Sequence, residues 1–360
     1  MKILMMSYTY PPATGGIETF SSLMREAFVA RGHDVRVVTE IDGTMPEDAE
    51  HGVIRRPGRA ALRQAIAWAD VCAVCGLSLH YQIPVLLGGR PLTITHQVWQ
   101  ESQNGTVDWR NRLRLFFCRF GLNIAVNSAL ARDLKMPALT IPNPLPGEIE
   151  LGPPIAGRPR DLVFVGRLVS EKGVPVLLDA IARLQERGRL VTATIIGDGP
   201  LRAGLERYAA GLNLPVPVEF LGRMAPAGFH PILRQHKIMV VPSVYREAFG
   251  IVTLEGLGAG CMVLVSNAGG LPEVLGQCGL TFPMRDSNAL AALIEEILAA
   301  PEMTVPYIKA IPSHLESMRP ERLAERYLAV FERLHFHQTV KGTGRREAIR
   351  QTARELSRQT

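Results

Sequence analysis

Each half of the chain begins with an apolar strand, which is followed by a loop that contains glycine and then by a helix. This repeat is the sequence feature that restricts the fold most. In the first half the strand is Lys2 to Met6, the loop contains Gly15 and Gly16, and the helix begins at Ile17. A second strand follows at 33–38. A strand, a helix and a strand in this order favour a parallel sheet covered by helices. We therefore expect an α/β fold of the doubly wound type.

The length indicates two domains. A chain of 360 residues suits two domains of about 150 to 170 residues, and its 47% apolar content can fill both cores. Six prolines and three glycines lie between Ile141 and Arg160, a composition typical of a linker. We predict a first domain at 1–142, a linker at 143–160, a second domain at 161–318, a helix at 319–336 and a basic tail at 337–360.

Further elements follow from apolar runs and their spacing. We predict a loop at 41–58, a helix at 60–68, strands at 71–74, 91–95 and 122–126, and in the second half strands at 192–196, 218–222 and 261–266.

Neither end of the chain nor its cysteines suggest an exported or membrane-spanning protein. No run of about 20 apolar residues exists, and Ser7 and the prolines that follow end the apolar N-terminus too early for a signal peptide. The five cysteines are dispersed. Cys72 and Cys75 have the spacing of a redox or metal motif, but they lie in a strand-like run without a second pair, which favours thiols in the core. We expect a cytoplasmic protein.

The formal charge of +6 is unevenly distributed. Residues 341–358 contain six basic residues (Lys341, Arg345, Arg346, Arg350, Arg354 and Arg358) and two acidic ones. We expect this tail to contact an anionic membrane or another acidic partner, or only to keep the protein soluble. In residues 109–120, four arginines alternate with Trp109, Leu113 and phenylalanines. A helix of this composition packs on a sheet, contacts an anionic membrane, or does both; nucleic acid is the less favoured partner.

The stretch from Pro242 to Glu255 carries the strongest functional signal. It follows an apolar run and reads as the end of a strand, a loop and the start of a helix at Ile251. The N-H groups of a helix start attract an anion such as phosphate. Glu247 and Glu255 bracket this helix start, so their carboxylates could accept hydrogen bonds from hydroxyl groups on either side. Together these groups suit a nucleotide sugar.

This stretch resembles the Glu-x7-Glu motif of the retaining GT-B glycosyltransferases, in particular those of family 4. Four further segments are similar to motifs of that family, and the resemblance covers about residues 1–336, most densely 161–275. These segments are Gly15-Gly16-Ile17-Glu18, Thr95-His96-Gln97, Gly166-Arg167-Leu168 with Lys172-Gly173, and Gly269-Gly270-Leu271-Pro272-Glu273. The chain departs from the family at Gln97, where Asp is frequent, and at Pro144, where Gly is frequent.

The resemblance implies two Rossmann-like domains that face each other across a cleft, with the helix at 319–336 crossing back to the first domain. It implies that Arg167 and Lys172 neutralise the leaving diphosphate, that Glu247 and His96 contact the sugar, and that Glu255 accepts from the ribose. Four of these five residues are the predicted catalytic residues: His96, Arg167, Lys172 and Glu247. The predicted donor-binding residues are Gly15, Gly16, Gly166, Gly222, Arg223, Phe249, Gly250, Ile251, Val252 and Glu255.

The predicted activity is transfer of a hexose from a UDP- or GDP-linked sugar to a glycan or lipid-linked acceptor, as in polysaccharide biosynthesis. The resemblance implies retention at the anomeric carbon. No cofactor or metal is expected, because no Asp-x-Asp occurs and Arg167 and Lys172 already supply positive charge. Two alternatives stay open: a GT-B-fold nucleotide-sugar epimerase, and a non-catalytic adaptor that binds membrane or nucleic acid.

Overall fold

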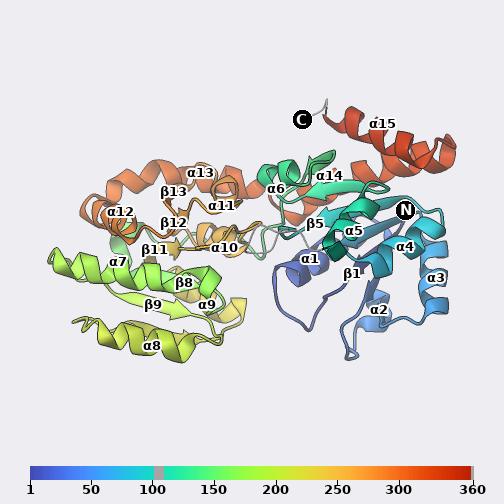
Figure 1. Cartoon of the computed structure of the whole chain (residues 1–360). Coiled ribbons are helices and arrows are strands. Elements are labelled where there is room, and N and C mark those ends of the chain that lie inside the picture. The colour runs from blue at the N-terminus through green and yellow to red at the C-terminus, as the bar shows by residue number, and fades with distance from the viewer. Residues whose placement is uncertain (101–108, 358–360) are drawn as a thin grey trace. The chain divides into compact units, whose positions relative to one another are not determined.

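The computed structural model describes residues 1–100 and 109–357, which form two compact units. One unit is Met1–Pro144 together with Met318–Thr360, and the other is Leu145–Ser317 (Figure 1). Each contains one parallel sheet flanked by helices, so the predicted doubly wound α/β class is confirmed.

The first unit is built on a seven-stranded sheet in the order β3-β2-β1-β4-β5-β6-β7. Its strands are β1 (Lys2–Ser7), β2 (Asp34–Thr39), β3 (Val53–Arg55), β4 (Val71–Cys75), β5 (Leu92–His96), β6 (Leu122–Ala125) and β7 (Ala138–Thr140). The strand order reverses between β1 and β4, which pair in parallel from Ile3 with Val71 to Ser7 with Cys75. Ligands of such sheets bind at the carboxyl ends of the strands near this reversal.

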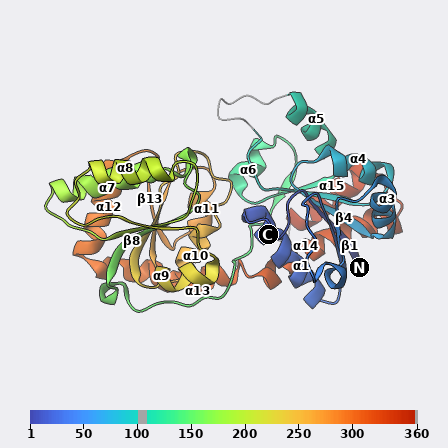
Figure 2. The same cartoon turned by 90° about the horizontal axis from the view of Figure 1, so that it is seen from below.

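Helices cover both faces of the first sheet. They are α1 (Gly16–Ala30), α2 (Asp48–His51), α3 (Arg59–Trp68), α4 (Leu79–Leu87), α5 (Trp109–Cys118), α6 (Ser128–Asp133), α14 (Pro320–His335), a π-helical turn η4 (Phe336–Val340) and α15 (Arg345–Ser357). One core joins the sheet to α1, α14 and α15, and a second joins it to α3 and α4. Figure 2 shows α14 beside α1, where the ring of Tyr327 packs edge-on and that of Phe331 at a tilt against Phe28. The predicted return of the C-terminal helix to the first domain is therefore confirmed.

Before the Pro-rich segment, the sequence prediction was wrong in four places in this unit, and one of them is α6, which was not predicted. Residues 41–58 are not one loop, because they contain α2 and the short edge strand β3. Helix α4 and strand β7 were not predicted at all: α4 contains Pro84, a residue that usually interrupts a helix, and β7 has only three residues.

The basic C-terminal segment is a helix rather than an extended tail. α15 packs beside α14, with Ala348 and Thr352 buried, while Arg346 and Arg350 are exposed. The apolar residues Ala348, Ile349 and Leu356 recur at helical spacing together with the buried Thr352. This pattern is hard to see in the sequence because arginines are so frequent there. Arg358 lies outside the described residues.

The second unit is built on a six-stranded sheet in the order β10-β9-β8-β11-β12-β13. Its strands are β8 (Arg160–Val165), β9 (Ala193–Ile196), β10 (Glu219–Gly222), β11 (His236–Val241), β12 (Met262–Ser266) and β13 (Gly279–Phe282). Its helices are α7 (Val174–Glu186), α8 (Arg202–Gly211), α9 (Pro226–Leu233), α10 (Val252–Gly258), α11 (Leu271–Leu275), α12 (Ser287–Ala299) and α13 (Val305–Glu316), with short 3-10 turns η1 (Ile155–Gly157), η2 (Ser170–Lys172) and η3 (Pro301–Thr304).

The core of the second unit lies mainly between the sheet and helices α7, α8 and α12. The Pro-rich segment predicted as a linker contributes to this unit: Leu145 and Ile155 are buried. Arg158 is also buried, and its guanidinium donates to the carbonyls of Pro153, His236 and Ala259. This part of the chain is therefore held against the end of the sheet by side-chain hydrogen bonds.

No helix within residues 1–100 and 109–357 is both long enough and apolar enough to cross a membrane.

Candidate active site

The predicted donor-binding segments gather at the carboxyl edge of the second sheet. The strand order reverses between β8 and β11, which pair in parallel, and the loops after these two strands carry the Arg-Lys and the Glu-x7-Glu motifs. The backbone continues the sheet there: Gly166 N-H donates to Ile196 O at 3.0 Å, and Gly197 N-H donates to Gly222 O at 2.8 Å. This edge is where an open α/β sheet binds its ligand.

Gly173 allows the two motif loops to approach each other. Its φ is +66°, and a Cβ atom at this position would lie 1.9 Å from the carbonyl oxygen of Pro242. Only glycine adopts such a conformation against backbone without strain. The contact places Lys172, the residue before Gly173, directly beside the loop that carries Glu247.

Lys172 and Glu247 form an ion pair between Nζ and Oε1. Ser243 Oγ donates to the same carboxylate oxygen at 2.9 Å, and the hydroxyl of Ser266 donates to the Ser243 carbonyl at 2.6 Å. The side chains of Lys172 and Glu247 are 25% and 17% exposed, so the pair is accessible without being fully solvated. Two predicted catalytic residues are thus brought together, and Ser243 is a positioning residue that the sequence reasoning did not assign.

Glu247 is also fixed through its backbone. Its carbonyl oxygen accepts from Gly270 N-H at 2.7 Å, and a short parallel bridge joins it to Gly269. Gly269 has a φ of +64°, and a Cβ there would lie 2.3 Å from the Glu247 carbonyl oxygen. The turn at 269–273, predicted from the family motif, therefore supports the loop that presents the carboxylate.

Glu255 lies on α10 beside His230 of α9. The His230 Nε2 atom is 3.7 Å from Glu255 Oε1, and their side chains are 26% and 11% exposed. Within the described part of the chain, His230 Nε2 is buried and has no hydrogen-bond partner. His230 was not predicted, because a histidine 25 positions before Glu255 gives no sequence signal.

The other donor residues surround these carboxylates in different environments. Arg167 follows β8 and is exposed, Gly222 ends β10 with a φ of +73°, and Arg223 after it is exposed. Phe249 is buried, and Gly250 has a φ of +78° before α10 begins. Ile251 and Val252 are half-buried at the start of that helix.

In the first unit, Gly15 and Gly16 lie at the start of α1, as predicted. Both are exposed, and Gly15 precedes the first turn with extended backbone. The Gly15 carbonyl accepts from the Thr19 N-H at 3.1 Å and from its hydroxyl at 2.9 Å, which closes this turn. A 15-residue helix that starts beside a glycine loop is typical of a phosphate-binding element.

His96 ends β5 and is fully buried. Its Nε2 is 2.9 Å from Asn123 Oδ1, and the Asn123 amide nitrogen donates to the carbonyls of Cys118 and Gly121. Because those two bonds set the direction of the Asn123 amide, its oxygen accepts and His96 carries its proton on Nε2. His96 Nδ1 is then an acceptor, and it is buried without a partner in the described residues.

Gln97 does not replace the family's Asp as a partner of His96. Its amide forms two reciprocal hydrogen bonds with the amide of Asn143, at 2.9 and 2.8 Å. Both side chains are buried. The pair joins the loop after β5 to the segment that leaves the first unit, and the orientation of His96 is set by Asn123 instead.

Because the His96 imidazole is buried, we predict that the stability of the first unit depends on pH. Burial lowers the pKa of His96 from 6.5 to about 4. The fold keeps the imidazole neutral, whereas the unfolded chain binds a proton as the pH falls below 6.5. The contribution of His96 to the unfolding free energy is therefore fully present above pH 6.5 and is lost as the pH drops toward 4. Between pH 7 and pH 5 we expect the first unit to lose about 2 kcal/mol of unfolding free energy through this group.

The measurement is urea unfolding followed by tryptophan fluorescence, since Trp68, Trp99 and Trp109 all lie in the first unit. His96→Asn should have a lower stability at pH 7 but a smaller loss on going to pH 5. An equal loss in both proteins would contradict a neutral buried His96.

The cysteines take no part in the candidate site. All five are free and buried, and burial raises the pKa of Cys72 and of Cys75 to about 12. The predicted core role of the C-x-x-C pair is confirmed.

Comparison with known proteins agrees with this geometry. Residues 159–300 match the family model described as glycosyl transferases group 1. The glycogen synthase of Mycobacterium tuberculosis is 26% identical over 365 residues, covering 84% of this chain and 87% of that protein. A GDP-mannose-dependent phosphatidylinositol dimannoside mannosyltransferase of the same organism is 36% identical over 149 residues, 39% of this chain and 36% of the relative.

Among solved structures, the Anabaena protein HepE in complex with UDP is similar with a TM-score of 0.75 at 19% identity. The match covers 92% of this chain and 100% of that one. The fold of the chain is therefore that of the GT-B glycosyltransferases, with two Rossmann-like domains. The region 159–300, which contains the Arg-Lys and Glu-x7-Glu motifs, is thus similar to the glycosyl transferases group 1.

Proposed function

We propose that the chain transfers a hexose from a UDP- or GDP-linked sugar to a glycan or lipid-linked acceptor, with retention at the anomeric carbon. The observation that carries this proposal is the Lys172–Glu247 pair at the point where the strand order of the second sheet reverses. Glu255 lies in the first turn of α10, the helix that follows this loop. A cation for a diphosphate and two carboxylates for hydroxyl groups are the chemistry that a nucleotide sugar needs. Two similar proteins point the same way, one solved with UDP and one named for GDP-mannose.

In the proposed reaction the bond between the anomeric carbon and the diphosphate breaks, the acceptor oxygen bonds to that carbon, and the proton of the acceptor hydroxyl passes to an oxygen of the departing diphosphate. Negative charge grows on the departing diphosphate, and Lys172 and Arg167 stabilise it. The bond from Ser243 and the ion pair with Lys172 hold Glu247 in place before the donor arrives. Such preorganisation avoids rearrangement of the site during the reaction. We propose that no metal ion takes part, because these two cations supply the charge.

For the first unit we propose His96 as the residue that contacts the donor sugar, with Gly15 and Gly16 near the diphosphate. The free lone pair on His96 Nδ1 would accept from a sugar hydroxyl. A ring that stays neutral down to about pH 4 is suited to accept this bond at neutral pH rather than to donate a proton.

We also propose that the protein acts in polysaccharide biosynthesis on the cytoplasmic side of a membrane. Helix α5 supports a peripheral contact, because Trp109 and Phe116 are 67% and 50% exposed and arginines flank them. The sequence favoured packing of this apolar stripe on the sheet, but only Cys118 of the helix is buried. Exposed aromatic and basic groups on one helix are typical of an interfacial segment.

The test is a thermal-shift screen with UDP, GDP, ADP and dTDP and their common sugars, with and without EDTA. A nucleotide at a hundred times its Kd stabilises the protein by about 2.7 kcal/mol, which is easily seen. One selective shift that EDTA leaves unchanged supports the proposal, as does sugar transfer that requires an acceptor. Release of an isomerised sugar without acceptor would favour the epimerase, and no shift with any nucleotide would favour the adaptor.

Glu255→Ala is expected to weaken donor binding about tenfold to a hundredfold, because it removes a charged acceptor for the ribose hydroxyls. Isothermal titration with the nucleotide identified in the screen measures this. Glu296→Ala, which removes an exposed carboxylate on α12, is the control and should leave the Kd unchanged. A Kd for Glu255→Ala within about twofold of the parent would remove Glu255 from the site.

A further inference from the structure

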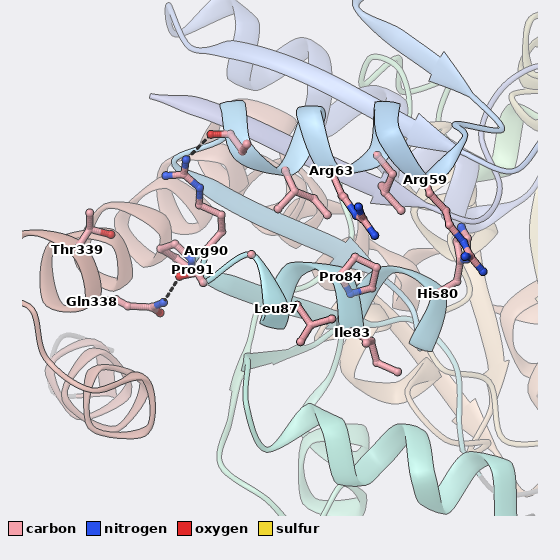
Figure 3. Close-up of a pocket in the computed structure, with 15 residues that line it drawn as sticks. Arg59, Arg63, His80, Ile83, Pro84, Leu87, Arg90, Pro91, Gln338 and Thr339 are labelled. Atoms are coloured by element: carbon pink, nitrogen blue, oxygen red, sulfur yellow. Dashed lines mark hydrogen bonds between the residues drawn. The ribbon is translucent and has the colours of Figure 1, made fainter.

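A groove on the first unit lies between α3 and α4, away from the residues discussed so far. It has a volume of about 980 Å³ and is closed at one end by the turn Gly88–Gly89–Arg90–Pro91 and by Gln338 and Thr339 of η4. The Gln338 amide donates to the Gly89 carbonyl at 2.9 Å, and Arg90 donates to the Ala67 carbonyl (Figure 3). These bonds hold the end of the groove together and occupy Arg90.

The charged residues of the groove are all basic. Among its fifteen lining residues, which all belong to the described part of the chain, Arg59, Arg63 and Arg90 carry the charges and none has a carboxylate. Arg59 and Arg63 are exposed and lie one turn apart on α3, and neither has a hydrogen bond or ion pair within the described residues. Figure 3 shows both side chains extending from α3 toward α4.

One groove residue, His80, has an acidic neighbour, but that carboxylate is already engaged. Glu40 lies 3.2 Å from His80 Nε2 and accepts from the Tyr81 hydroxyl at 3.0 Å. The positive charge of Arg59 and Arg63 is therefore uncompensated, and two guanidinium groups one turn apart suit a phosphate group.

The other wall of the groove is apolar and open. Ile83, Pro84 and Leu87 line it from α4, and Leu87 is 84% exposed. Below them Leu62 and Ile66 of α3 are buried. Helix α5, which does not line the groove, packs beside α4 and exposes Trp109, Leu113 and Phe116. An exposed leucine beside unpaired arginines fits a ligand that is anionic at one end and apolar at the other.

We propose that this groove docks an anionic phospholipid at a bilayer surface. The phosphate group lies against Arg59 and Arg63, and the apolar part of the lipid contacts Ile83, Pro84 and Leu87. A soluble nucleotide fits less well, because the fifteen lining residues offer no carboxylate for ribose hydroxyls. The proposal concerns a site separate from the donor-binding loops and does not depend on which nucleotide they bind.

The test is co-sedimentation of the full chain with vesicles of phosphatidylcholine alone and of phosphatidylcholine with roughly 30% phosphatidylglycerol. We expect binding only to the second kind. Arg59→Gln/Arg63→Gln should bind about 30-fold more weakly, since each basic residue near an anionic surface contributes about fivefold. Leu87→Ser, which changes no charge, should bind about tenfold more weakly, because the leucine side chain no longer buries apolar surface against the lipid.

The matched control is Arg207→Gln/Lys309→Gln, which removes the same charge from exposed positions of the second unit. It should bind these vesicles like the parent protein. Equal weakening by both double variants, no dependence on phosphatidylglycerol, or displacement by millimolar inorganic phosphate would each overturn the proposal. Donor-induced thermal shifts should be unchanged in every variant, so this result is read independently of the donor site.

Discussion

Lys172→Ala is expected to lower kcat for sugar transfer by about 10² to 10³, the loss typical of removing one preorganised group from a developing negative charge. Lys172 is held against Glu247 at the edge of the second sheet, so its charge is in place before the diphosphate begins to leave. Because the charge on the diphosphate grows during the reaction, the variant should lose far more kcat than donor affinity. Steady-state kinetics at saturating donor, with donor Kd measured separately, checks this.

The control is Lys309→Ala, which removes an exposed lysine from α13 and should leave both quantities unchanged. Lys172→Arg keeps a cation and should recover part of the rate. If Lys172→Ala raises the donor Kd as much as it lowers kcat/KM, the residue binds the ground state only. A kcat within about threefold of the parent would remove Lys172 from the catalytic residues.

Gly173→Ala is expected to destabilise the second unit by about 3 kcal/mol or more. Its backbone has a φ of +66°, and the new Cβ would lie 1.9 Å from the Pro242 carbonyl oxygen, so the two motif loops must separate. Urea unfolding followed by far-UV circular dichroism measures the change. The fluorescence transition of the first unit, which contains every tryptophan, serves as an internal reference.

Gly188→Ala is the matched control for this experiment. Gly188 has a φ of +78°, but nothing lies within 4 Å of a Cβ built there, so only the backbone strain remains. It should cost about 1 kcal/mol. Equal losses in the two variants would show that the contact with Pro242 contributes nothing beyond the conformation of the glycine.

Buried strands were the most predictable part of the fold. Strands such as β4 and β11 are apolar on both faces because helices cover both sides of a parallel sheet, and this leaves continuous apolar runs in the sequence. The edge strands β3 and β7 have three residues each and no such run. Helix α4 was missed because Pro84 interrupts its pattern, although Tyr81 and Val85 of this helix are buried by tertiary packing.

The candidate site was predictable only where a motif contains it. Glu247 and Glu255 are close in sequence, so their spacing is visible, and Lys172 was found through its own motif. The ion pair between Lys172 and Glu247 joins residues 75 positions apart, and no local pattern shows it. The same holds for His230 beside Glu255 and for Asn123, which sets the tautomer of His96. Such partners arise from strand order, which is decided by the whole sheet.

The two units differ in the order in which a ribosome can complete them. Leu145–Ser317 is one continuous segment, whereas the first unit needs α14, whose Leu323, Tyr327 and Phe331 are buried in its core. At roughly 5 to 20 residues per second, synthesis of the intervening segment takes on the order of 10 to 40 seconds. During that interval the part of the first core that Leu323, Tyr327 and Phe331 fill stays open, so we expect the half that is made first to expose apolar side chains until the chain is nearly complete.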